Sequence, residues 1–232
     1  MDPFAPLAAQ GLNLHAVFDL NTLPAEVLAS LNLRGSDVGR FTQLILLGHA
    51  GRDFWGALKR RGLHGSDPVD TFVGECVQAL MAGPLADHSW RQVFPGPQAV
   101  NLQKLGLLAG WHQRSPLGLG VDAEWGSWFA YRAVVLARTH LPATPKRALT
   151  SPCLTCVDQP CISACPAGAL ACDQPSPWRL QTCLTHRLQP ASGCQDRCSA
   201  RNACPVGEAS RYSDEQVAYH CLHSLAAIRS LV

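Results

Sequence analysis

The spacing of hydrophobic and polar residues changes repeatedly along the first 145 positions, which predicts an α+β domain. An apolar run over 42–47 ends in Gly48-His49-Ala50-Gly51, a pattern typical of a buried strand that enters a turn. The residues over 128–137 are largely apolar, as in a strand that is covered on both faces. The other predicted elements are helices over 52–61, from Pro68 onward and over 100–109, and strands over 89–95 and 117–121.

A second domain is predicted over 146–232, because Pro142 and Pro145 interrupt regular structure just before it. Its prolines and cysteines predict loops with little regular structure. The exception is a C-terminal helix, where Ser213 and Gln216 form a capping box in which the glutamine side chain reaches back to the cap. An apolar stripe is expected to bury one face of that helix: Val217, Cys221, Leu222, Leu225 and Ile228.

Composition gives no indication of a nucleic-acid or membrane partner. The chain has 19 Lys and Arg against 17 Asp and Glu, and neither part of the sequence carries a basic stripe. No apolar run reaches the roughly 18 residues of a membrane-spanning helix. Because free thiols in such number persist in a reducing compartment, a cytoplasmic location is predicted.

Of the 11 cysteines, all but Cys76 lie between Cys153 and Cys221. Two runs end in Cys-Pro, as do the runs that bind the clusters of bacterial two-cluster ferredoxins. The first run is Cys-x2-Cys-x4-Cys-x3-Cys-Pro, and the second is a single cysteine followed by Cys-x3-Cys-x5-Cys-Pro. In the ferredoxins the fourth cysteine of a run binds the other cluster. Two [4Fe–4S] clusters are therefore predicted, one held by Cys153, Cys156, Cys161 and Cys204, the other by Cys183, Cys194, Cys198 and Cys165.

Disulfides and structural zinc are the alternatives to clusters. The start Met1-Asp2-Pro3-Phe4 lacks the pattern of a secretion signal, and a chain of 232 residues buries a core without disulfides. Zinc sites more often use two compact Cys-x2-Cys pairs, and only Cys153 and Cys156 form one here. The cysteines outside the two runs are predicted to be buried core residues: Cys76, Cys172 and Cys221.

Several segments resemble two related families of cobalamin proteins. The stretch Val121-Asp122-Ala123-Glu124-Trp125-Gly126-Ser127-Trp128-Phe129-Ala130-Tyr131-Arg132 is similar to a segment found in both. One family is the epoxyqueuosine reductases, in which a corrinoid-binding domain precedes a two-cluster ferredoxin domain. The other is the cytosolic cobalamin-processing chaperone that is defective in combined methylmalonic aciduria and homocystinuria, type C.

Further matches occur in the same order along the chain. Ser66-Asp67-Pro68-Val69-Asp70 and Arg211-Tyr212-Ser213-Asp214-Glu215-Gln216-Val217-Ala218-Tyr219 resemble the chaperone, and Arg179-Leu180-Gln181-Thr182-Cys183-Leu184-Thr185 resembles the reductases. The resemblance implies a flavin-nitroreductase-like open-sheet domain over 1–145 that binds a corrinoid, followed by a two-cluster ferredoxin-like domain. A flavin is an alternative cofactor for that domain, because this sheet fold binds flavin without a glycine-rich motif.

The resemblance implies five candidate residues for cofactor binding. Trp128, Phe129 and Arg132 match a chaperone segment near the active cleft, where the arginine helps to bind the thiol cosubstrate. Core packing is the alternative for the two aromatic residues, and a buried Asp is the alternative partner for Arg132. His112 lies where both families turn toward the corrinoid, although a buried histidine with ordinary hydrogen bonds also fits. Arg211 is the fifth, with a solvated position beside the helix cap as its alternative.

The sequence departs from the reductases at one point of chemistry. They carry an acidic residue just ahead of the helix expected at 100–109, whereas this chain has Pro95-Gly96-Pro97-Gln98-Ala99 and no proton donor there. The hypothesis is therefore an iron–sulfur oxidoreductase that passes electrons from an electron-donor protein through its clusters to a corrinoid, for cobalamin reduction or dealkylation. The alternatives are a ferredoxin-like electron carrier without corrinoid, and a queuosine-type reductase with a substrate other than tRNA.

Overall fold

The computed structural model describes residues 2–33, 39–145, 150–171 and 178–230. Two compact units make up the chain. The first unit combines Met1–Gly110 with Phe129–Ala148, and the second combines Trp111–Trp128 with Leu149–Val232. Each unit is therefore built from two separate stretches of sequence, and the chain passes from the first unit to the second, back, and out again.

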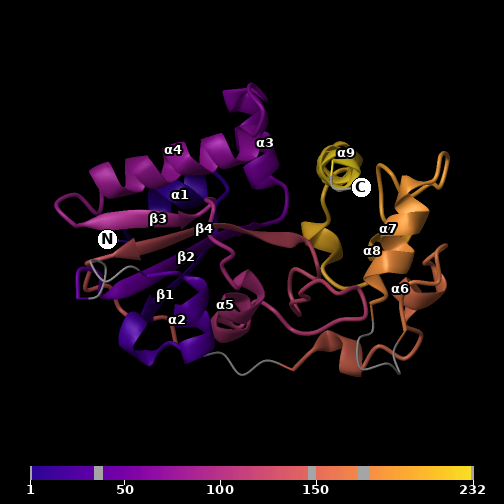
Figure 1. Cartoon of the computed structure of the whole chain (residues 1–232), viewed down its shortest axis with the longest axis horizontal. Coiled ribbons are helices and arrows are strands. Elements are labelled where there is room, and N and C mark those ends of the chain that lie inside the picture. The colour runs from indigo at the N-terminus through magenta and orange to yellow at the C-terminus, as the bar shows by residue number, and fades with distance from the viewer. Residues whose placement is uncertain (1, 34–38, 146–149, 172–177, 231–232) are drawn as a thin grey trace. The chain divides into compact units, whose positions relative to one another are not determined.

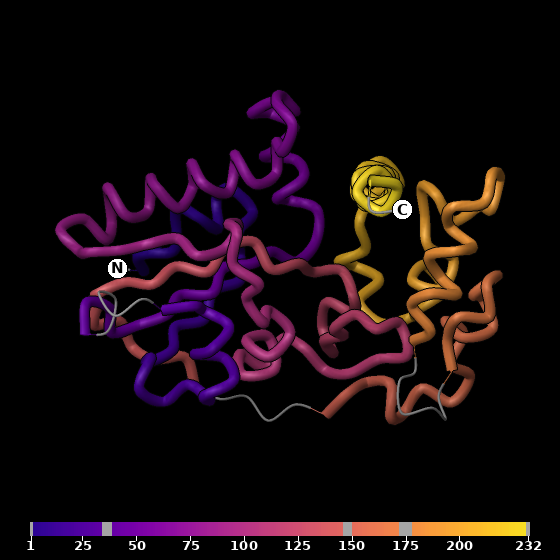
Figure 2. Tube along the Cα trace, in the orientation of Figure 1, coloured from indigo at the N-terminus to yellow at the C-terminus, as the bar shows by residue number. Residues whose placement is uncertain are grey.

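The first unit is built on a four-stranded antiparallel sheet with the order β1-β2-β4-β3 (Figures 1 and 2). All eight residues of the central strand β2 are buried, and so are the last five of β4, as expected for strands covered on both faces. The strands span Leu14–Asp19 (β1), Gln43–Ala50 (β2), Trp90–Phe94 (β3) and Phe129–Ala137 (β4).

Helices cover the sheet, with α3 and α4 on one side and α2 and α5 on the other (Figure 1). Pro68 begins α4, although the Asp67 side chain makes no capping hydrogen bond. Asn101 caps α5 by accepting from the Lys104 backbone N–H at 3.1 Å, and the left-handed Gly110 ends it. The helices span Ala5–Ala9 (α1), Ala25–Ser30 (α2), Asp53–Arg61 (α3), Pro68–Ala82 (α4) and Leu102–Ala109 (α5).

The predicted α+β class is confirmed, and the elements predicted at β2, β3, β4, α3, α4 and α5 occur within a few residues of their predicted positions. The prediction missed β1, because Leu14–Asp19 is short and carries His15 and Asp19 among its apolar residues. The segment around Pro142 and Pro145, where the prolines predict an interruption of regular structure, is held by hydrogen bonds to β1. The Thr144 N–H donates to the Val17 carbonyl, and the Val17 N–H donates to the Thr144 hydroxyl, each at 2.8 Å. This segment therefore extends along the edge strand β1.

The strand predicted over 117–121 is wrong. The Ser115 hydroxyl donates to the Leu119 carbonyl at 2.7 Å, and the left-handed Gly118 closes a turn. Between Gln113 and Val121 the described structure has an isolated bridge instead of a strand pair. The turn predicted at 122–126 is confirmed, because Asp122 Oδ1 accepts from backbone N–H groups two and three residues further on.

The second unit consists of short helices between loops. The expectation of little regular structure is wrong at α7, a nine-residue helix that carries Cys183. Prolines at 160, 166, 190 and 205 keep the neighbouring elements short. The helices span Pro160–Ser163 (α6), Leu180–Leu188 (α7), Ser199–Asn202 (α8) and Asp214–Arg229 (α9), with single 3-10 turns at Pro152–Leu154 and Glu208–Ser210.

Of the two hydrogen bonds in the predicted capping box of α9, the structure has the one to the Ser213 side chain. Ser213 Oγ accepts from the Gln216 backbone N–H at 3.2 Å. The Gln216 side chain does not reach back; it is fully buried and makes no hydrogen bond with the described residues. The apolar stripe buries Val217 and Leu225, but Leu222 is half exposed, which corrects its place on the buried face. No helix within the described ranges has the length and apolar character needed to cross a membrane.

Candidate functional site

The first set of predicted cysteine ligands lines one cavity. Cys153 lies in a 3-10 turn that Ser151 caps, Cys156 follows that turn, Cys161 lies in α6, and Cys204 follows α8. The cavity thus combines three cysteines of the first run with the last cysteine of the second. The rest of its lining is uncharged: Pro116, Pro152, Gln159, Pro160, Pro205 and Val206.

The second set of predicted ligands lines another cavity of the same unit, of about 270 Å³. Cys183 comes from α7, Cys194 and Cys198 from the loop before α8, and Cys165 from the end of the first cysteine run. The two cavities therefore take their fourth cysteine from the opposite run, in the crossed arrangement that the sequence predicts.

Each group of thiols forms an electrostatic neighbourhood of its own. Burial raises the pKa of Cys161 to about 11, and nearby Cys204, Cys153 and Cys156 contribute to that rise. Burial also raises the pKa of Cys194, with added contributions from the other cysteines of the second cavity. Four mutually repelling thiolates in a buried site need a cationic group among them to stay deprotonated.

Four thiols in each cavity are the kind of donor set that a [4Fe–4S] cluster takes. Within the described residues, no three His, Cys, Asp or Glu side chains are arranged to hold one metal ion. The first cavity is much smaller than the second, about 20 Å³ against about 270 Å³, so the fit there rests on its four thiols and not on volume.

The three remaining cysteines differ in position. Cys76 is buried in α4, where burial raises its pKa to about 11, and it packs as a core residue as predicted. Cys172 lies outside the described residues. Cys221 packs against the buried cluster of Trp128, Tyr212 and Val217, and it also lines the second cavity. The core prediction for Cys221 therefore describes only part of its surroundings.

The candidate Arg132 occupies an irregular position of β4. The register between β2 and β4 shifts so that Leu47 pairs with Ala133 and Gly48 with Tyr131, which leaves Arg132 as the extra residue of a β-bulge. Its Nε donates to His49 Nδ1 at 3.0 Å, and its guanidinium lies 5.0 Å from the centre of the Phe54 ring.

A buried histidine thus supports this arginine. His49 is fully buried and stacks on Phe54 with ring centres 4.5 Å apart. Because Nδ1 accepts from Arg132, the imidazole carries its proton on Nε2. Partial burial raises the pKa of nearby Asp70, while the positive charge of Arg132 acts against that rise. The only signal for His49 in the sequence was its place after an apolar run.

The aromatic candidates for cofactor binding are buried. Trp128 is fully buried between the Tyr212 ring, 5.5 Å away, and the Arg201 guanidinium, 4.4 Å away. Phe129 packs edge-on against the Tyr131 ring at 5.7 Å. These contacts match the core-packing alternative for both aromatic residues.

The polar candidates His112 and Arg211 lie in the second unit. His112 is 6% exposed, and burial, followed by the charge of Arg114, lowers its pKa. Arg211 donates from Nη2 to the Cys204 carbonyl at 3.2 Å, and its guanidinium lies 5.8 Å from the Trp128 ring. Arg211 therefore contacts the backbone of a first-cavity cysteine. The sequence did not predict this contact.

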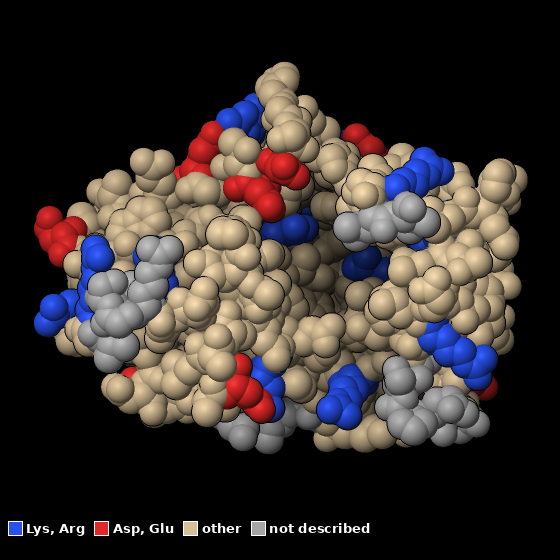
Figure 3. All heavy atoms as spheres, viewed as in Figure 1, with Lys and Arg blue, Asp and Glu red and all other residues tan. Residues whose placement is uncertain are grey.

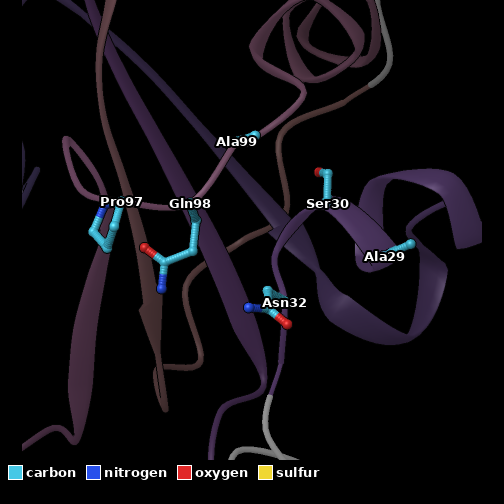
Figure 4. Close-up of a pocket in the computed structure, with 6 residues that line it drawn as sticks. All are labelled: Ala29, Ser30, Asn32, Pro97, Gln98 and Ala99. Atoms are coloured by element: carbon cyan, nitrogen blue, oxygen red, sulfur yellow. The ribbon is translucent and has the colours of Figure 1, made fainter.

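The segment without a carboxylate forms one wall of a pocket in the first unit. Its lining combines the end of α2 with residues 97–99, and the Gln98 and Asn32 amides both extend toward the space between them (Figure 4). Ser30 closes the pocket, its hydroxyl held between the Val27 carbonyl and the Asn101 N–H. Among the described residues, this lining offers neutral amides and no group that donates a proton readily at neutral pH.

Comparison with known proteins relates this architecture to one group of enzymes. No protein-family model matches the sequence, and no curated protein matches it. A solved epoxyqueuosine reductase in complex with an epoxyqueuosine-modified tRNA-Tyr stem loop has a TM-score of 0.56 at 13% identity, over 92% of this chain and 66% of its own. The Bacillus subtilis enzyme, with its catalytic aspartate loop swung out of the active site, has a TM-score of 0.53 at 13% identity, over 92% of this chain and 66% of its own. The Streptococcus thermophilus enzyme has a TM-score of 0.50 at 12% identity, over 88% of this chain and 65% of its own.

At these identities the comparison establishes the fold: this chain has the fold of the epoxyqueuosine reductases over most of its length. It spans just under two thirds of the length of those enzymes.

Proposed function

We propose that this protein is an iron–sulfur oxidoreductase that passes electrons from two [4Fe–4S] clusters to a corrinoid bound with the help of its first unit. The observation that carries the proposal is the pair of cavities, each lined by four cysteines in the crossed arrangement. The shared fold with epoxyqueuosine reductases supports the same class of chemistry.

In this proposal the protein supplies the ligands and their surroundings. Bound clusters supply single electrons at low potential, and the cobalt of a corrinoid accepts electrons one at a time. The first-cavity thiols lie among prolines and Val206. Cys183 and Cys194 are held near Arg187, which offsets the charge of their thiolates.

Arg132 is the residue of the first unit proposed to contact the corrinoid. The bulge turns it out of the regular strand pattern, and His49 and Phe54 fix its guanidinium. A planar cation held this way suits the amide oxygens or the phosphate of a corrinoid side chain. The sequence resemblance at 121–132 is the second support for this role.

A queuosine-type reductase with another substrate is the alternative that the fold favours. The pocket beside Gln98 argues against it, because its lining contains no carboxylate. The resemblance to the reductases implies an acidic residue just ahead of the helix at this point of the chain. Nucleic acid is not part of the proposal. On the face drawn in Figure 3, the described Lys and Arg side chains are scattered, with Asp and Glu between them. A bound RNA backbone favours a continuous basic surface.

The test is an anaerobic titration of hydroxocobalamin into cluster-loaded protein, followed by dithionite and visible spectroscopy. A saturable spectral shift and faster cobalt reduction than in protein-free buffer are expected. No shift and no acceleration would leave an electron carrier without corrinoid.

Two arginines of the same strand region provide a matched comparison. Arg132→Met is expected to weaken the corrinoid shift at unchanged iron content, and Arg132→Lys to restore part of it. Arg138→Met, at an exposed position just beyond β4, is expected to bind like the parent protein. Equal affinity in the Arg132→Met and Arg138→Met variants would remove Arg132 from the site.

A further inference from the structure

The two cysteine-lined cavities differ in charge. Three arginines line the second cavity, Arg187, Arg197 and Arg201, whereas the described walls of the first contain prolines, Gln159 and Val206 besides its cysteines. Two of these arginines lie inside the lengthened spacers of the second cysteine run: Arg197 between Cys194 and Cys198, and Arg201 between Cys198 and Cys204. The departure from the compact ferredoxin spacing therefore brings positive charge to one cavity.

Arg187 is fixed in place by three hydrogen bonds. Its Nε donates to the Cys194 carbonyl at 3.2 Å, Nη2 to the Cys221 carbonyl at 2.9 Å, and Nη1 to Ser224 Oγ at 3.2 Å. The guanidinium thereby joins α7, the cysteine loop and α9 at the wall of the second cavity.

Arg201 is also held in place, by contacts with Ser127 and Trp128. Its Nε donates to Ser127 Oγ at 3.2 Å, and its guanidinium lies 4.4 Å from the centre of the Trp128 ring. Arg197 differs, because it is exposed and forms an ion pair of 3.0 Å with Asp196 that cancels much of its charge. The first cavity has Arg211 behind it, bound to the Cys204 carbonyl and outside the cavity wall.

We propose that Arg187 and Arg201 raise the reduction potential of the second cluster above that of the first, so that the second site takes up an electron first. A cluster with four thiolates gains negative charge on reduction, and fixed positive charges in a partly buried site stabilise that state. An external one-electron reductant supplies the electron. An electron that enters at the first site passes to the second, so that the first site is oxidised again as the second is reduced. No bond forms or breaks.

This inference rests on the cluster part of the proposed function and is independent of corrinoid. The test is a redox titration of the cluster-loaded protein followed by EPR. Variants Cys156→Ala and Cys183→Ala, each expected to retain one cluster, assign the two signals. In the parent protein the signal retained by Cys156→Ala is expected at the higher potential.

Charge removal at Arg187 then tests the cause. Arg187→Gln is expected to make reduction of the second cluster at least tenfold less favourable, a shift of about 59 mV for one electron, and to leave the first unchanged. Arg187→Lys, which keeps the positive charge, should retain most of the parent potential. Arg201→Gln should lower the potential of the second cluster, as Arg187→Gln does. Arg197→Gln is the control, with a small shift expected because Asp196 already offsets its charge.

Two results would overturn the inference: a higher potential at the first cluster, or equal shifts of both clusters in Arg187→Gln and Arg201→Gln. Iron analysis before the titration separates this failure from that of the proposed function. Protein that binds no iron contradicts both, whereas two loaded clusters with unaltered potentials contradict the role of the arginines alone.

Discussion

Each Cys-Pro pair is followed two residues later by a left-handed glycine, and the two glycines differ in their surroundings. Gly168, in Cys165-Pro166-Ala167-Gly168, has φ +57°, and a Cβ added there would have open space within 4 Å. Gly207, in Cys204-Pro205-Val206-Gly207, has φ +72°, and a Cβ added there would overlap the backbone carbonyl of Trp125. The backbone at Gly207 therefore touches the segment that leads to Trp128.

The two substitutions to alanine differ in cost. Gly168→Ala places a side chain in the left-handed region, which costs about 1–2 kcal/mol. Gly207→Ala adds to this a backbone clash that only a main-chain shift relieves, and overpacking of this kind costs a further ~1–3 kcal/mol. We expect Gly207→Ala to be less stable than Gly168→Ala by about 1–3 kcal/mol on this account.

The measurement is chemical unfolding of both variants, together with their iron content after anaerobic reconstitution. Because Cys204 lies three residues before Gly207, the shift should also reduce occupancy of the first cluster. Gly168→Ala should keep the parent iron content. Equal destabilisation, or full iron in Gly207→Ala, would refute the claim that this close backbone contact positions Cys204.

Three further predictions concern single side chains. Cys156→Ala should lose about half of the bound iron, because it removes one ligand of the first site, while Cys76→Ala should keep it all; elemental analysis of both variants compares them. Burial lowers the pKa of His112 below its usual 6.5, so the unfolded chain binds the proton more readily; stability should fall as pH drops below 6.5, and His112→Gln should flatten that part of the unfolding-against-pH curve. Gln216→Leu should raise the free energy of unfolding by about 1 kcal/mol or more in a denaturant titration, because the buried amide has no hydrogen bond among the described residues; a loss of stability would show that the amide has a partner.

Those parts of the molecule in which local pattern and chemistry agree were predictable from the sequence. The strand at β2 and the helix that begins at Pro68 are set by their own apolar spacing and by proline geometry. The spacing of the cysteines alone predicted which of them share a cavity, because the ligands of a cluster recur at characteristic intervals along a chain. The structure brings each set together in one cavity.

Features that depend on distant contacts were missed. The bulge at Arg132 exists only through the pairing of β4 with β2, which no pattern in either strand announces. Arg187 has no distinguishing neighbours in the sequence, and its position at the second cavity arises from the carbonyls of Cys194 and Cys221. The segment over 117–121 has strand-like composition, yet Gly118 and the Ser115 hydroxyl turn the chain there.

The measurement that tests the central claim most directly is the iron and acid-labile sulfide content of the anaerobically reconstituted chain, with Mössbauer spectra to identify the clusters. Two [4Fe–4S] clusters correspond to about eight iron and eight sulfide per chain. The account predicts that content, with a single spectral class of cubane clusters. Zinc in place of iron, or no sulfide, would contradict the account of both cavities.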